Sequence, residues 1–160
     1  MDTEEKLTAL FEALGAPSPA GWARSQLSQG IPQLERFLFL RAAWREVVRD
    51  GDTSWVDRFI ADALRHPNAP YAGVGLALAR LRKQGACDED IAAVIRGMQA
   101  ELLFSFCYLL DDPGMLEPEV DTVGWALFAI DADGQPLYPI QGLHESVLET
   151  DPTGREMRPK

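Results

Sequence analysis

Residues 88–110 decide the fold, and they read DEDIAAVIRGMQAELLFSFCYLL. Asp88 and the two acids that follow it suit the start of a helix, because the helix dipole favours negative charge in the first turn. Apolar residues then recur at helical spacing, and from Leu102 onward they surround almost the whole circumference. A helix that is apolar all round is normally enclosed by other elements. We therefore expect one central helix over 88–110, with its second half in the middle of the molecule.

Shorter elements are expected on both sides of this helix. Amphipathic spacing and turn residues predict earlier helices over about 3–14, 32–49, 53–65 and 71–84, with a short helix over 21–27 as an alternative to a loop. After the central helix, two apolar runs flank Asp133 and Gly134, a pair typical of a hairpin turn. Weaker patterns indicate a short helix over 117–123, a final helical turn over 143–149, and either helix or strand over 118–128.

Together these elements predict a mainly α protein. We expect a compact bundle of about five helices around the central helix, followed by a short C-terminal β-hairpin and a polar tail. The chain has 160 residues, which is the size of one domain, so we expect a single helical domain over 1–150 and a tail over 151–160.

Composition excludes several classes of protein. Apolar residues make up 46% of the chain and charged residues 25%, as in an ordinary globular protein rather than a disordered one. No apolar run reaches the roughly 20 residues that a membrane span needs, and the acidic N-terminus is unlike a secretory signal. Cys87 and Cys107 would lie about 30 Å apart along the helix, too far for a disulfide. We therefore expect a cytoplasmic protein without membrane contact.

The charge is distributed unevenly along the chain. Between Gly97 and Gly154 there is no Lys or Arg, whereas the same stretch holds eleven Asp or Glu residues. Such a region either keeps the protein soluble or forms a negative surface for a cationic partner. It argues against nucleic-acid binding, which needs a basic stripe. The predicted negative surface consists of Asp111, Asp112, Glu117, Glu119 and Asp121.

Two charged residues fall on apolar helix faces. Glu101 lies in the most apolar part of the central helix, and Arg41 lies within the apolar arc of the 32–49 helix. A buried charge needs a partner or becomes neutral, so we expect Glu101 to pair with an arginine of the 32–49 helix, with Arg41 as the first candidate. This pair is either a structural ion pair or, together with Tyr108, the lining of a small pocket.

Known catalytic and metal-binding motifs are missing from the sequence. Zinc, di-iron and calcium patterns are incomplete, and no nucleophile elbow or phosphate loop occurs, so we expect no metal and no cofactor. His144, followed by Glu145, is the one credible acid–base residue. We expect both residues to belong to a binding surface rather than to a catalytic centre.

The leading functional prediction is a small acidic regulatory module, without enzymatic activity, that binds a cationic protein. The alternative is a small-molecule-binding protein or an enzyme that uses a pocket near Arg41, Glu101 and Tyr108, or His144. A structural component of an oligomer is a third hypothesis. The sequence names neither the partner nor the oligomeric state.

Overall fold

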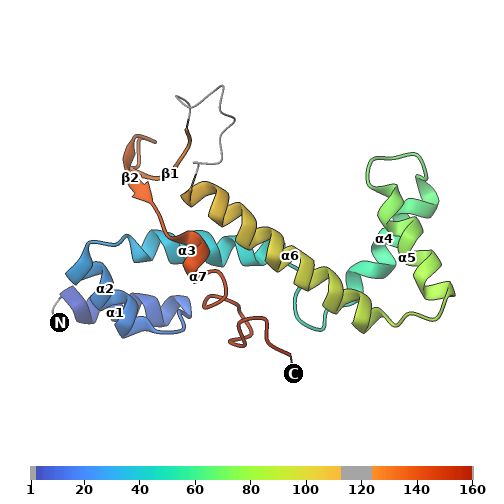
Figure 1. Ribbon diagram of the computed structural model, residues 1–160, viewed down its shortest axis with the longest axis horizontal. Helices are drawn as coiled ribbons and strands as arrows, with labels where there is room; N and C mark the ends of the chain where they lie inside the picture. The colour runs from blue at the N-terminus through green and yellow to red at the C-terminus, as the bar shows by residue number, and fades with distance from the viewer. Residues whose placement is uncertain (1–2, 113–123, 160) are drawn as a thin grey trace. The chain divides into compact units, whose positions relative to one another are not determined.

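The computed structural model describes residues 3–112 and 124–159. These residues are mainly helical and form seven α-helices and one antiparallel pair of strands, as predicted (Figure 1). The chain divides into two compact units, a terminal unit of Met1–Glu46 with Ala100–Lys160, and a middle unit of Val47–Gln99. The expected single domain over 1–150 stays a prediction.

The terminal unit begins with helices α1 (Thr3–Leu14), α2 (Pro19–Gln29) and α3 (Gln33–Ala43). The first two lie side by side (Figure 1). Their core joins Phe11, Trp22 and Phe37, whose rings meet edge to face with centroids 5.3–6.1 Å apart. The helix predicted over 32–49 is shorter than expected, because after α3 the chain tightens into a 3₁₀ turn, η1 (Trp44–Glu46).

The same unit contains the predicted hairpin and the predicted final helical turn. Strands β1 (Leu127–Ile130) and β2 (Pro136–Ile140) pair antiparallel, and α7 (Leu143–Ser146) follows directly. Leu127 and Phe128 are therefore strand, whereas the short helix predicted over 117–123 lies outside the described residues. Trp44 fixes the segment after α7, because its indole N–H donates to the Val147 carbonyl at 3.0 Å.

The start of the expected tail is folded. The buried Asp151 carboxylate accepts hydrogen bonds from the backbone and hydroxyl of Thr153 and from the backbone of Met157. One carboxylate thus holds the turns that follow it, in the manner of an Asx turn.

The middle unit consists of α4 (Ser54–Arg65), α5 (Ala72–Lys83) and the first half of α6 (Asp88–Asp111). Its core is made by Val56, Leu78 and Ile91, one from each helix. Arg82 binds Asp57 at 2.6 Å and Asp88 at 2.5 Å. The hydrogen bond from Arg82 lowers the pKa of Asp88, which favours its ionised form at the start of α6.

Helix α6 confirms the predicted helix but not its predicted surroundings. Its second half is not enclosed, since Leu102 is 56% exposed and Phe106 is 55% exposed, whereas Ala100 and Cys107 are buried. The expectation of a fully wrapped helix was wrong because neighbouring elements cover only the face that carries Ala100 and Cys107. A helix that is apolar on all sides in sequence can still have few elements packed against it, because the sequence of the helix does not determine its neighbours.

Candidate functional site

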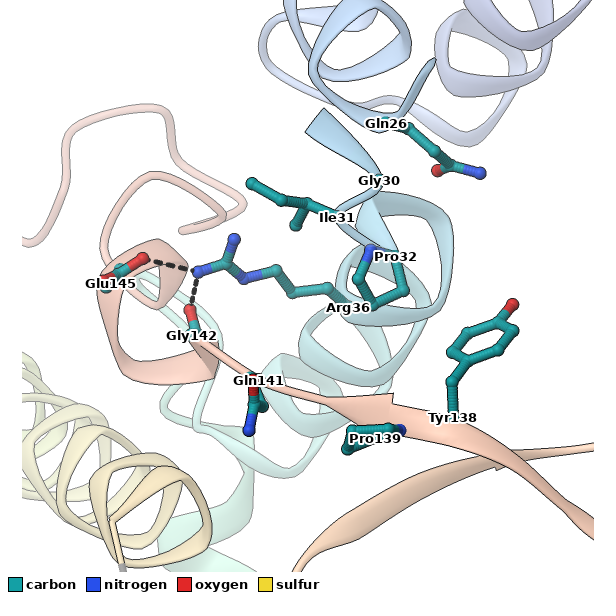
Figure 2. A pocket seen from close by; sticks show the side chains of 10 residues that line it. All are labelled: Gln26, Gly30, Ile31, Pro32, Arg36, Tyr138, Pro139, Gln141, Gly142 and Glu145. Carbon is teal, nitrogen blue, oxygen red and sulfur yellow. Dashed lines mark hydrogen bonds and ion pairs between the residues drawn. The ribbon is translucent and has the colours of Figure 1, made fainter. Parts of the chain in front are cut away.

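A buried arginine joins α3 to the C-terminal segment. The Arg36 side chain is 5% exposed, and its guanidinium donates to the Glu145 carboxylate at 2.9 Å and to the Gly142 carbonyl. Figure 2 shows the side chain reaching from α3 to these two acceptors. Gly142 has a φ of +70°, and a Cβ at this position would collide with the guanidinium. Glycine suits this position through its backbone conformation, and it leaves room for the guanidinium.

A cavity of about 600 Å³ adjoins this arginine. Figure 2 shows its walls, which come from the turn between α2 and α3 and from the β2–α7 segment. The apolar part of the wall is Ile31, Pro32 and Pro139, and the polar part includes the amides of Gln26 and Gln141. The volume lies within the range of roughly 300–1,000 Å³ that is common for small-molecule sites.

Tyr138 closes one side of the cavity. Its hydroxyl donates to the Glu35 carboxylate at 2.6 Å, and this hydrogen bond raises the pKa of Tyr138. Tyr138 is thus a neutral donor, occupied by Glu35, rather than a base. Arg36 is the cationic group of the cavity wall and Glu145 the anionic one.

A second cluster lies at the end of α6, where Asp111 meets His144. One oxygen of the buried Asp111 carboxylate lies 2.6 Å from His144 Nδ1 and accepts the His144 backbone N–H at 3.0 Å. The rings of Phe104 and Tyr108 meet the imidazole edge to face, with centroids 6.0 and 5.1 Å away. Through these contacts Asp111 joins α6 to α7.

The Asp111–His144 arrangement resembles the orienting pair of an acid–base catalyst, in which a carboxylate fixes the imidazole. Within residues 3–112 and 124–159, however, no hydroxyl or thiol hydrogen-bonds the remaining ring nitrogen. The nearby Cys107 is buried, which raises the pKa of its thiol to about 12 and keeps it protonated. The pair therefore acts here as a structural connection.

The predicted ion pair between Arg41 and Glu101 is not formed. Glu101 is exposed, and the described residues contain no salt bridge between the two side chains. The prediction failed because it assumed that Glu101 lies on a buried face of α6. The buried arginine of α3 is Arg36 instead, and its carboxylate comes from Glu145, 109 positions away. The ring of Tyr108 lies against the imidazole of His144.

The predicted negative surface is only partly described. Asp111 is buried and bonded to His144, so it belongs to the interior and not to the surface. Asp112 is exposed and accepts the Tyr108 hydroxyl at 3.3 Å. Glu117, Glu119 and Asp121 lie outside the described residues, and their role stays a prediction.

An apolar surface runs along the second half of α6. Leu102, Phe106 and Leu109 are all exposed, and their spacing of four and three residues puts them on one side of the helix. We call this surface the α6 face. Trp125 lies at its end, because its indole N–H donates to the Leu109 carbonyl at 2.7 Å. Exposed apolar surface of this kind is typical of interaction sites.

Sequence reasoning missed Arg36, Gln26, Tyr138 and Gln141. Arg36 lies outside the centre of the apolar arc of the 32–49 helix, so it did not stand out as a buried charge. A usable signal was Gly142, a glycine directly before a short helical segment, which is typical of a backbone that must approach another group closely. Gly142 thus indicates a close approach at its own position, but it does not identify Arg36 as the residue that makes it.

In the part of the chain that the structure describes, no three His, Cys, Asp or Glu side chains are grouped as they would be to hold a metal ion. Comparison of the chain with protein-family models, curated proteins and solved structures found no match.

Proposed function

We propose that this chain is an acidic cytoplasmic binding module, without enzymatic activity of its own, that captures a positively charged protein partner. The observation that carries the proposal is the α6 face, where Leu102, Phe106 and Leu109 are exposed side by side. Burying a leucine or phenylalanine side chain is worth about 1.5–3 kcal/mol, so covering this surface would supply substantial binding energy.

The spacing of the α6 face favours a helical partner. Side chains at i, i+4 and i+7 form the contact stripe through which amphipathic helices pack against each other. The partner segment would place its own apolar residues between Leu102, Phe106 and Leu109. Packing of this kind needs no cavity in either molecule.

Charge supports a basic partner. Glu101 is exposed and lies one residue from Leu102 on α6, and no Lys or Arg occurs between Gly97 and Gly154. A segment with Lys or Arg beside its apolar stripe would therefore meet no like charge from this part of the chain. Complementary charge of this kind speeds association and selects against acidic partners.

A membrane is the competing occupant of the same surface. α6 is long and apolar enough to cross a bilayer, with a mean hydropathy of 1.3 over its most apolar stretch, of which 17% is buried. Length and composition alone are weak evidence, and a charge at the bilayer centre costs roughly 2.5–3.5 kcal/mol. α6 carries both Arg96 and Glu101 in its middle, which favours the protein partner.

The test uses a labelled amphipathic helical peptide of Leu and Lys, with binding measured by fluorescence anisotropy. The variant Leu102→Ser/Phe106→Ser should weaken binding by at least about tenfold, because two apolar contacts are lost. Leu64→Ser is the matched control, since Leu64 is at least as exposed as Leu102 but lies on α4. Charge reversal at Glu117, Glu119 and Asp121 should weaken binding more at low salt than at high salt.

Three results would contradict the proposal. One is equal binding of a Leu–Glu peptide, which would show that charge plays no part. Another is equal loss in Leu64→Ser, which would remove the role of the α6 face. The third is stronger binding to neutral lipid vesicles than to the peptide, lost in the double variant, which would assign the surface to a membrane.

A further inference from the structure

We infer that the cavity beside Arg36 is a binding site for a small amphiphilic monocarboxylate, in which the ligand carboxylate replaces Glu145 as the partner of the guanidinium. This inference does not depend on the α6 face, because the cavity is built from the α2–α3 turn and the β2–α7 segment. The evidence concerns the state of Arg36, the state of Glu145 and the composition of the wall.

Arg36 is a buried cation with unused donor capacity. Its side chain is almost inaccessible to solvent, and its buried Nε has no hydrogen-bond partner among the described residues. A guanidinium presents a planar row of donors that matches the two oxygens of a carboxylate. Among the described residues, the acid that pairs with this guanidinium is Glu145, through a single oxygen, while Nη1 donates to the Gln33 amide oxygen at 3.4 Å. A ligand carboxylate would therefore meet Arg36 through Nη2, the donor that Glu145 now occupies.

Glu145 is suited to being displaced. Its side chain is 67% exposed even though it binds a buried partner, so it can move into solvent at little cost. An incoming carboxylate would keep Arg36 neutralised throughout the exchange. This avoids the large cost of leaving a buried charge without a partner. A neutral or cationic ligand offers no such exchange.

The rest of the wall indicates the other half of the ligand. Ile31, Pro32 and Pro139 offer apolar contact in the same wall as the guanidinium (Figure 2). The Gln26 side chain uses its oxygen to accept the Leu34 backbone N–H at 2.9 Å, which leaves its amide N–H groups for a ligand acceptor. A compact apolar group attached to a carboxylate would satisfy these surroundings.

Isothermal titration calorimetry with phenylacetate, hexanoate and benzoylglycine tests the inference, each beside its uncharged amide. At least one acid should bind the whole protein more tightly than its amide. Glu145→Ala should tighten that binding by about fivefold, because the competing carboxylate is gone. Glu46→Ala, which removes an exposed carboxylate of the same unit outside the cavity wall, should leave it unchanged.

Arg36→Met should abolish the preference for the acid over the amide. Because this variant could fail to fold, the gain of affinity in Glu145→Ala carries the test, since misfolding does not tighten binding. The inference is overturned if no acid binds Glu145→Ala better than its amide does. It is also overturned if the acid binds Glu145→Ala, Glu46→Ala and the unaltered chain equally. Neither result bears on the α6 face.

Discussion

Replacing Gly142 with alanine tests whether the Arg36 anchor holds the C-terminal segment in place. Gly142 has a φ of +70°, and a residue with a Cβ pays roughly 1–2 kcal/mol for this left-handed conformation. The new methyl group would also lie 2.8 Å from the central carbon of the Arg36 guanidinium, which must then move away. The substitution thus combines a backbone penalty with the loss of the Arg36 contacts.

The second penalty is the larger one. The hydrogen bond from the charged Arg36 guanidinium to the Gly142 carbonyl is expected to contribute about 1.5–3 kcal/mol. The ion pair between Arg36 and the exposed Glu145 carboxylate contributes less. The total expected loss of unfolding free energy in Gly142→Ala is therefore roughly 3–5 kcal/mol. Gly154→Ala is the matched control, because Gly154 has a φ of +69° and open space where the new Cβ would lie. It should lose only the backbone penalty of about 1–2 kcal/mol.

Urea unfolding followed by tryptophan fluorescence measures both variants. In a Trp55→Phe background the remaining tryptophans, Trp22, Trp44 and Trp125, all belong to the terminal unit, so the signal reports on the unit that contains Arg36. If Gly142→Ala loses no more stability than Gly154→Ala, the guanidinium does not occupy the space beside Gly142, and the anchor is wrong.

Two further predictions concern the close approach of α4 and α5 and the buried thiol. Gly75→Ala should destabilise the middle unit by about 1–3 kcal/mol, because its Cβ would lie 2.6 Å from the Ala63 methyl carbon. Gly73→Ala is the control and should not destabilise this unit, because its Cβ would lie in open space. Hydrogen exchange of α4 and α5 peptides measures the difference, and equal protection in both variants would contradict the prediction. Dithionitrobenzoate at pH 8 should modify one thiol per folded chain, the exposed Cys87, because burial raises the pKa of Cys107 to about 12. Two fast-reacting thiols, or one that survives Cys87→Ser, would show that Cys107 is accessible.

Local sequence signals predicted most of the secondary structure. Spacing, acidic starts and glycine stops placed the helices at 3–14, 54–65, 72–83 and 88–111 within one or two residues. Asp133 and Gly134 predicted the hairpin between β1 and β2 in the same way. These signals act within one turn of helix or one tight turn, so they need no information about distant parts of the chain.

The sequence also identified Asp111, His144 and Glu145 as residues of interest, but not their partners. Asp111 meets His144 across 33 positions, and Glu145 meets Arg36 across 109. Charge pattern favours such pairs in general, yet it does not choose among several arginines and many acids. The choice depends on which helix faces meet when the chain closes, and this explains why Arg36 rather than Arg41 became the buried cation.

By itself, the sequence determined a mainly helical chain, the limits of α6 and a region of unbalanced negative charge. Only the tertiary structure decided which side of α6 is covered, which arginine is buried and where a cavity remains. The physical reason is that hydrogen-bonded turns and side-chain periodicity are set by near neighbours along the chain. Burial and ion pairing instead depend on contacts between segments that are far apart in the sequence.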